Sequence, residues 1–422
     1  MTKENPVENQ MNDKSYFWII GGGQMQVPLI EEASRLGMRS IVTDLNPQCV
    51  CSPLADKFFV LDIFDIKGHL RLAEQLIKEN IKIRGVLAAG IDAPETMARL
   101  AQHMQLPGVK PEIAQLVHHK ANFRKRLEEL GYPVPRYVSF SREQLHELPF
   151  LANSIGYPLI IKNTDSSGSR GTRIFHEANP LVMLEVAQTA ITVSKSGTAL
   201  IESCWEGSEH TVETLFDVRG QFHPCFITDR NFEKSDGYAL ETGLRHPSML
   251  SEATQQEMYA IACSVATDIG VTIGAAKFDF MVTSAGPRII EMTVRLSGGF
   301  DCQYLVPAAT GKAVLRAAIL TAIGEDFDAS MLADRLNRVG VTGSLWPKPG
   351  RITAISGVDE ARQLPGVEKI FFRYAPGDIV EPYVDCTRRV CFIVTTGADE
   401  AEALDNLRRV EETIKIQIIH EA

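Results

Sequence analysis

The sequence predicts an α/β fold with a parallel-sheet domain at its amino-terminal end, a central domain and a small α+β domain at its carboxy-terminal end. Three observations lead to this prediction. Strand-like and helical patterns alternate over residues 16–115, two apolar strands joined by a short turn follow at 274–295, and short strands precede a helical pattern at 398–414. The chain has 422 residues, of which 45% are hydrophobic and 23% charged, so it can bury two or three cores.

The amino-terminal region has the rhythm of a doubly wound sheet. Buried strands are expected at 16–20, 40–44, 58–62 and 85–89, with helical patterns between them. This alternation predicts a Rossmann-like domain over residues 15–115, with helices on both faces of a parallel sheet.

A glycine turn follows the first of these strands. Gly21 and Gly23, with Asp44 at the end of the next strand, are similar to a dinucleotide-binding fingerprint. Gln26 occupies the third glycine position, which makes dinucleotide binding and a dehydrogenase function the weaker interpretation. Farther along, Asp92 and Glu95 follow a strand end, where they could contact an amine or cap a helix.

The most informative stretch is a predicted hairpin whose two strands flank a turn at 283–286. Side chains alternate between the faces of a strand. The residues that share a side are Lys277 and Asp279 in the first strand, and Glu291, Thr293 and Arg295 in the second. If the strands pair, carboxylates and cations face each other in an apolar sheet, which is costly unless a ligand or metal compensates. A purely structural network of acidic and basic residues is the alternative.

A second segment has the character of a phosphate-binding loop. The strand 157–162 ends in Lys162 and continues into a Ser- and Gly-rich loop at 163–173, whose N–H groups can surround phosphate oxygens. The Gly-Lys-Ser/Thr ending of a Walker loop is absent. A flexible turn is the alternative for this loop in isolation.

These segments together resemble the ATP-grasp superfamily. Asp279 followed by Glu291-Met-Thr-Val-Arg295 is similar to its metal-binding segment Glu-x-Asn-x-Arg, with Thr293 in place of the asparagine. The resemblance runs from about Tyr16 to Ile418, and it is strongest to the L-amino-acid ligases and the carbamoyl-phosphate-synthase-like carboxylate–amine ligases.

The resemblance implies a domain organisation. An ATP-grasp domain would span 116–325, with a nucleotide lobe at about 125–203 and a metal and substrate lobe at about 204–325. A carboxy-terminal α+β cap would span 340–422.

The resemblance also implies roles for particular residues, with ATP and Mg²⁺ (or Mn²⁺) as cofactors. The catalytic residues would be Arg295 and Lys277, and the metal ligands Asp279, Glu291 and Thr293. ATP would be held by Lys120, Lys162, Ser167, Gly168, Ser169, Gly171, Glu202, Trp205, Glu209 and His210. The substrate would be contacted by Glu241, Arg245, His246, Ser297, Gly298 and Gly299. A solvated lysine is the alternative for Lys120, and a surface loop is the alternative for 231–247.

Composition excludes several classes of protein. The net charge of −10 argues against a general nucleic-acid-binding protein. No apolar run reaches membrane-spanning length, and Met1–Lys14 lacks the apolar core of a signal peptide. Eight cysteines without paired CxxC spacing are typical of a reducing cytoplasm. We expect a cytoplasmic protein without nucleic-acid or membrane partners, with a homodimer as one option for its assembly.

The function implied by the resemblance is an ATP-dependent carboxylate–amine ligase. The substrate carboxylate attacks the γ-phosphate to give an acylphosphate and ADP, and an amine then displaces phosphate to form an amide. The substrates would be a small carboxylate and an amine, with two amino acids joined as a dipeptide as one option. A carboxylating or formate-using ATP-grasp enzyme and a non-catalytic nucleotide-binding protein are the two alternatives.

Overall fold

The computed structural model describes residues 15–235 and 237–419. The amino-terminal part contains a four-stranded parallel sheet of order β3-β2-β1-β4. Its strands are β1 (Tyr16–Ile20), β2 (Arg39–Asp44), β3 (Lys57–Val60) and β4 (Ile83–Leu87), and its helices are α1 (Val27–Arg35), α2 (Ile66–Lys78) and α3 (Pro94–His103). All five residues of β1 are buried, as the apolar run predicts. The predicted parallel sheet is confirmed.

The next part begins with two short helices, α4 (Pro111–His118) and α5 (Lys120–Glu129). The helical pattern over 118–130 predicted one helix, but the chain bends at His119, which caps α5 by accepting a hydrogen bond from Asn122 N at 3.3 Å. An antiparallel sheet of order β5-β8-β6-β7 follows. It is formed by β5 (Tyr137–Ser141), β6 (Leu159–Asn163), β7 (Arg173–Phe175) and β8 (Thr198–Ser203), with helices α6 (Leu148–Ile155) and α7 (Pro180–Val193).

An eight-stranded sheet of order β13-β12-β9-β10-β11-β14-β18-β16 forms the centre of the molecule. Its strands are β9 (Ser208–Phe216), β10 (Phe222–Ser235), β11 (Tyr238–His246), β12 (Gly274–Thr283), β13 (Gly286–Thr293), β14 (Val339–Gly343), β16 (Val367–Phe372) and β18 (Cys391–Gly397). The surface-loop alternative for 231–247 is wrong, because this polar stretch forms parts of β10 and β11, which pair with each other.

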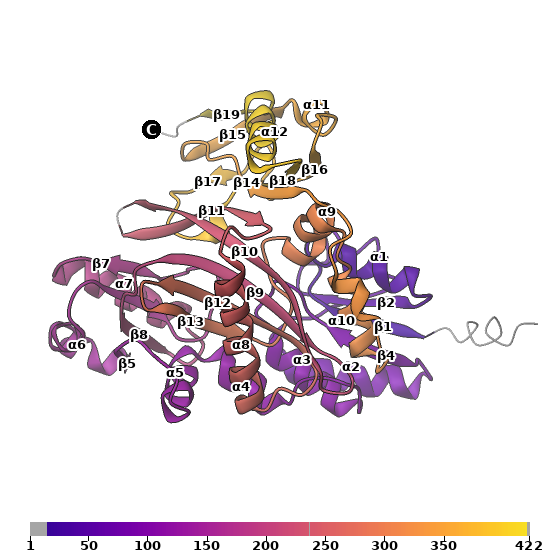
Figure 1. The fold of residues 1–422 in the computed structure, drawn as a ribbon, viewed down its shortest axis with the longest axis horizontal. Helices are drawn as coiled ribbons and strands as arrows, with labels where there is room; N and C mark the ends of the chain where they lie inside the picture. Colours follow the sequence, from indigo (N-terminus) through magenta and orange to yellow (C-terminus); the bar gives the residue numbers. More distant parts are fainter. Residues whose placement is uncertain (1–14, 236, 420–422) are drawn as a thin grey trace, which may run out of the picture.

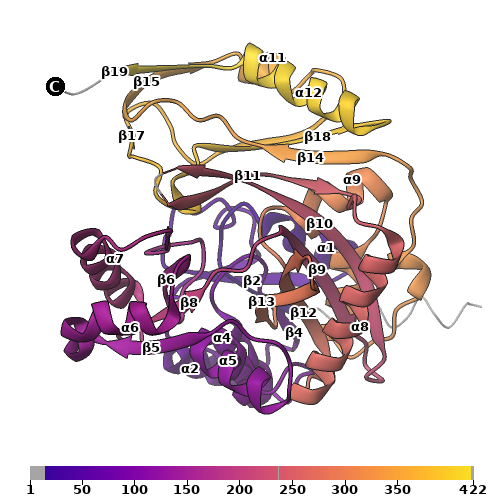
Figure 2. The ribbon, with the colours of Figure 1, turned by 60° about the vertical axis from the view of Figure 1, so that its left-hand side comes forward.

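The carboxy-terminal part completes this sheet and adds a smaller one. Strands β14, β18 and β16 extend the large sheet beyond β11. A three-stranded sheet of order β17-β15-β19 lies next to the helices α11 (Val358–Ala361) and α12 (Glu400–Thr413) in Figures 1 and 2. Its strands are β15 (Gly350–Ser356), β17 (Ile379–Val380) and β19 (Lys415–Ile419).

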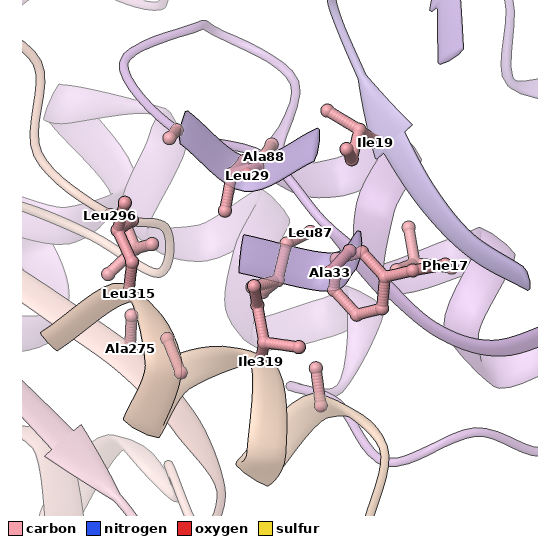
Figure 3. Packing of buried hydrophobic residues seen from close by; sticks show 14 of the residues in the cluster. Phe17, Ile19, Leu29, Ala33, Leu87, Ala88, Ala275, Leu296, Leu315 and Ile319 are labelled. Atoms are coloured by element: carbon pink, nitrogen blue, oxygen red, sulfur yellow. The ribbon is translucent and has the colours of Figure 1, made fainter. Parts of the chain in front are cut away.

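A hydrophobic core joins the first sheet to later parts of the chain. Figure 3 shows Phe17 and Leu87 of the amino-terminal sheet packed near Ile319, which belongs to α10 (Val314–Ala322). Gly85 permits this close approach, since a Cβ there would lie 2.8 Å from Phe17 Cε2 and 2.9 Å from the carbonyl oxygen of Ala322. The amino-terminal sheet is therefore fixed against the segment that follows the β12–β13 hairpin.

Within residues 15–235 and 237–419, no helix is both long and apolar enough to cross a membrane.

Truncating Phe17 tests this junction. Phe17→Ala removes a fully buried ring and is expected to lower the free energy of unfolding by about 3–5 kcal/mol. The measurement is the melting temperature, with Val60→Ala as a control because Val60 is 59% exposed. Equal melting temperatures for the two variants would contradict the prediction.

Candidate active site

The β12–β13 hairpin places two carboxylates directly opposite each other. Asp279 pairs with Glu291 and Lys277 pairs with Thr293 in the antiparallel register. The ammonium nitrogen of Lys277 lies 2.5 Å from Asp279 Oδ2 and 3.9 Å from Glu291 Oε1. The lysine charge therefore lies close to both carboxylates of the hairpin.

Asp279 is buried and has further partners on neighbouring strands. Thr211 of β9 donates to Asp279 Oδ1 at 2.9 Å, and Arg230 of β10 lies 3.3 Å from Asp279 Oδ2. Burial opposes the charged form, but Lys277 and Arg230 outweigh it and hold the pKa of Asp279 well below its ordinary range. Asp279 is thus an anion at neutral pH, as a metal ligand must be.

Arg230 connects three acidic side chains. Its guanidinium lies 3.4 Å from Glu209 and 2.8 Å from Glu241, in addition to its contact with Asp279. Glu241 also forms an ion pair at 3.2 Å with Arg389 from the carboxy-terminal part. Neither arginine was predicted from the sequence. The only available signal for Arg230 was its position at the end of an apolar strand pattern.

The β12–β13 hairpin presents the oxygen atoms that the sequence predicts as metal ligands. In the part of the chain that the structure describes, no three His, Cys, Asp or Glu residues form a group able to hold a metal ion. Mg²⁺ does not require one, since it is usually held by one or two carboxylates together with substrate phosphates and water. The oxygen donors of Asp279, Glu291 and Thr293 suit a hard cation, which would replace the ammonium group of Lys277 beside Asp279.

On the opposite lobe, Lys162 of β6 belongs to a buried charged triad. Its ammonium group forms an ion pair with Glu202 of β8, and Arg124 Nε of α5 donates to Glu202 at 2.7 Å. Burial opposes ionisation of Glu202, yet Arg124 and Lys162 lower the pKa of Glu202 to about 2. Arg124 also donates to the carbonyl of Ile290, next to Glu291, and so links this lobe to the β12–β13 hairpin.

The Ser- and Gly-rich loop between β6 and β7 is held from several sides. Asp92 accepts hydrogen bonds at 3.1 Å from both the backbone N–H of Ser167 and the guanidinium of Arg170. Lys120 donates to the carbonyl of Ser166 at 2.6 Å. Asp92 therefore contacts the predicted phosphate loop, and the helix-cap alternative does not describe it.

Glycines give the loop between β6 and β7 the backbone conformations that its turns require. Gly171 has φ +62°, and a Cβ there would lie 2.9 Å from Ala190 Cα of α7. Gly168 has φ +74°, Ser169 has φ +60°, and the carbonyl of Gly168 accepts a hydrogen bond from Cys386 N at 3.2 Å. The carboxy-terminal part thus touches the loop directly.

Arg295 follows β13 and is buried. Its Nη1 donates to the carbonyl of Leu296 at 2.9 Å, while its Nε has no partner in the described residues. The next residues lie against the amino-terminal sheet, because Gly90 N donates to the carbonyl of Leu296 at 3.1 Å and Gly298 lies beside Gly90. Arg295 is close enough to Asp92 to help lower its pKa against the effect of burial.

Several predicted residues are not brought to this cluster. His210 and Arg245 both contact Asp229, at 2.8 and 3.7 Å, on the face of the sheet opposite Glu209 and Arg230. His246 Nδ1 donates a hydrogen bond to the carbonyl of Ile227 at 2.9 Å, and burial lowers the pKa of His246 to about 4. Trp205 lies half-buried in the connection between β8 and β9. Their proposed roles stay predictions.

Family models match two parts of the chain. The model described as "Carbamoyl-phosphate synthase L chain, ATP binding domain" matches residues 119–330, which is half of the chain. The model described as "L-amino acid ligase C-terminal domain 2" matches residues 344–418.

Individual proteins give a consistent picture. The uncharacterized protein y4rH of Sinorhizobium fredii is 25% identical and covers 91% of this chain and 79% of its own length. Carnosine synthase 1 of Gallus gallus is 24% identical over 72% of this chain. The matched region covers only 35% of the length of that protein. The crystal structure of L-amino acid ligase from Bacillus licheniformis has a TM-score of 0.79 at 20% identity and covers 97% of this chain and 99% of its own. The predicted α/β fold class is confirmed, and this protein belongs to the ATP-grasp family of ligases that form carbon–nitrogen bonds.

Proposed function

We propose that this protein joins the carboxylate of one amino acid to the amine of another through an acylphosphate, and releases ADP and phosphate. The observation that supports the proposal most directly is the hairpin, in which Asp279 faces Glu291 with Lys277 between them and Arg295 follows at once. The similarity to L-amino acid ligase and to carnosine synthase supports amino acids as the substrates.

The proposed reaction proceeds in two steps. A carboxylate oxygen of the acid substrate attacks the γ-phosphorus of ATP, and the bond to ADP breaks. The amine nitrogen then attacks the acyl carbon, a C–N bond forms, the bond to phosphate breaks, and the amine loses a proton. Both steps depend on positioning and on neutralising the charge of the phosphoryl oxygens.

Side chains of this protein can be assigned to these tasks. Asp279 and Glu291, with Thr293, would hold Mg²⁺ (or Mn²⁺), which supplies a positive charge to phosphate oxygens when bound. Lys162 would contact the α- and β-phosphates beneath the loop that contains Ser167, Gly168, Ser169 and Gly171, with Lys120 at the start of α5 supporting that loop.

The remaining tasks concern the nucleoside and the transferred group. Arg295 and Lys277 would neutralise charge on the transferred phosphoryl group, and Glu209 would accept hydrogen bonds from the ribose. Glu241, held by Arg230 and Arg389, would face the acid substrate, near the backbone of Ser297, Gly298 and Gly299.

The setting of the enzyme is also part of the proposal. All eight cysteines are free and four of them are buried, which is typical of proteins of a reducing cytoplasm. We propose a cytoplasmic enzyme with small-molecule substrates; its assembly as a homodimer stays a prediction.

Arg295→Ala tests the transition-state role. The variant is expected to lower the rate of ADP release about 100-fold or more and to leave the Kd for ATP nearly unchanged, because the arginine acts on charge that develops during transfer. The assay uses Mg-ATP with a mixture of the proteinogenic L-amino acids, and product masses identify the pair that is joined. Arg362→Ala is the control, since Arg362 is 50% exposed and pairs only with Asp359 among the described residues. Unchanged turnover in Arg295→Ala would refute the assignment.

Lys162→Met tests nucleotide binding. Loss of the ammonium group is expected to raise the Kd for ATP tenfold or more, measured by calorimetric titration. The substitution leaves Glu202 paired with Arg124, so the buried site keeps a neutral ion pair and the variant is expected to fold. The melting temperature is measured beside the affinity, and a folded Lys162→Met protein with wild-type affinity would contradict the role of Lys162. Lys415→Met, at an exposed lysine, serves as the control.

A further inference from the structure

A cluster of buried polar side chains beside the hairpin has no role in the reaction described so far. The Glu213–Asp301 cluster consists of Glu213 of β9, Ser297, and Asp301, which begins the short π-helix η3 (Asp301–Leu305). These residues are 0%, 1% and 2% exposed. Glu213 Oε1, Ser297 Oγ and Asp301 Oδ1 have no hydrogen-bond partner in the described residues. Leaving a buried polar atom unpaired is destabilising, so these atoms call for a ligand.

The members of this cluster are close to one another. Ser297 N donates to Glu213 Oε2 at 2.8 Å. A Cβ placed on Gly299 would lie 4.0 Å from Asp301 Oδ1 and 2.7 Å from Leu244 of β11, so the Asp301 carboxyl turns back toward Gly299. Burial raises the pKa of Asp301 well above its ordinary range, and the negative charges of Glu241 and Glu213 raise it further.

The charge of the cluster distinguishes it from the rest of the site. Three other buried acids of the site, Asp279, Glu202 and Glu241, each form an ion pair with a lysine or arginine. Neither Glu213 nor Asp301 forms an ion pair within residues 15–235 and 237–419. The missing partner should therefore be a cation with several N–H donors, and a primary ammonium group has three.

The cluster also lies next to the reacting groups. The positive charges of Lys277 and Arg295 act on Glu213, and Ser297 is two residues from Arg295. Gln303 lies in η3 with Asp301 and is 5% exposed. Neither its amide nitrogen nor its amide oxygen has a hydrogen-bond partner in the described part of the chain. A group bound at Glu213 would therefore be near the carbon of an acyl group that Arg295 and Lys277 hold.

We propose that the Glu213–Asp301 cluster binds the ammonium group of the amine substrate and so positions the nucleophile for attack on the acylphosphate. This inference rests on the proposed ligase function and adds the site at which the second substrate is selected. The ammonium group supplies N–H donors to Glu213 Oε1 and Asp301 Oδ1, and its positive charge favours the ionised form of two acids whose burial otherwise favours the neutral form.

Hydroxylamine separates the two halves of the reaction. It is a small nucleophile that is uncharged at neutral pH and converts an acylphosphate into a hydroxamate, so it does not need an ammonium site. The full-length protein is incubated with Mg-ATP, the proteinogenic L-amino acids and hydroxylamine, and hydroxamates and dipeptides are quantified together by mass. Asp301→Asn and Glu213→Gln keep side-chain volume and remove the charge. Each is expected to reduce dipeptide formation about tenfold to 100-fold, while hydroxamate formation stays within about threefold of wild type.

Asp217→Asn is the matched control. Asp217 follows β9, its side chain is 3% exposed, and it pairs with His223 at 3.0 Å, so its loss should lower the melting temperature without changing the ratio of the two products. The wild-type protein gives an independent measurement. Guanidinium chloride below denaturing concentrations, a cation with several N–H donors that stays protonated at neutral pH and is therefore not a nucleophile, should inhibit dipeptide formation more strongly than hydroxamate formation.

The outcomes separate the two proposals. Absence of both products from the wild-type protein would overturn the ligase function and this inference with it. Equal loss of hydroxamate and dipeptide in folded Asp301→Asn and Glu213→Gln would show that the cluster serves the acid substrate or the fold, and would overturn the amine assignment alone. Unchanged dipeptide formation, or equal inhibition of both products by guanidinium, would also overturn it.

Discussion

The interaction on which this site depends is the ion-pair network around Asp279. Strand β12 supplies the Asp279 carboxylate and Lys277, and β10 of the same sheet supplies Arg230, in a buried setting where an unpaired charge would cost several kcal/mol. The network places negative charge where a divalent cation is expected and positive charge where phosphate is expected. Because Lys277 contacts Asp279, a divalent cation at Asp279 would have to displace the lysine.

The same sheet explains why three distant parts of the chain contribute to one site. Strand β11 carries Glu241, and the carboxy-terminal part supplies Arg389 to that carboxylate. At the other end, the segment after Arg295 lies on the amino-terminal sheet through the contact between Gly90 and Gly298. The eight-stranded sheet is therefore both the hydrophobic support of the molecule and the surface that aligns its charges (Figure 2).

Sequence patterns predicted the features that depend on local periodicity. Alternation along the hairpin correctly predicted that Lys277 and Asp279 share one side and that Glu291 and Thr293 share one side. Asp279 faces Glu291 because a β-bulge shifts the register by one residue between Asp279 and Phe280, which the alternation did not predict. The βαβ rhythm predicted the parallel sheet. The break at His119 was missed, because a capping residue interrupts a helix without changing its apolar pattern.

The sequence patterns did not predict features that arise from tertiary packing. Arg230, Arg389 and Arg124 approach carboxylates that are 11 to 148 residues away in the chain, and no local spacing relates them. The polar stretch at 231–247 has the composition of a loop, yet hydrogen bonding to strands on both sides makes it part of a sheet. The sequence allows Asp92 to be interpreted as a helix cap. Its hydrogen bond from the backbone N–H of Ser167 depends on how the amino-terminal parallel sheet packs against the β5-β8-β6-β7 sheet.

The hydrogen bond from Cys386 to Gly168 connects the carboxy-terminal part directly to the Ser- and Gly-rich loop. This loop is fastened at one edge by Asp92 and at another by Cys386, so lifting it requires both hydrogen bonds to open. Opening of the loop is thereby tied to motion of residues more than 200 positions later in the chain.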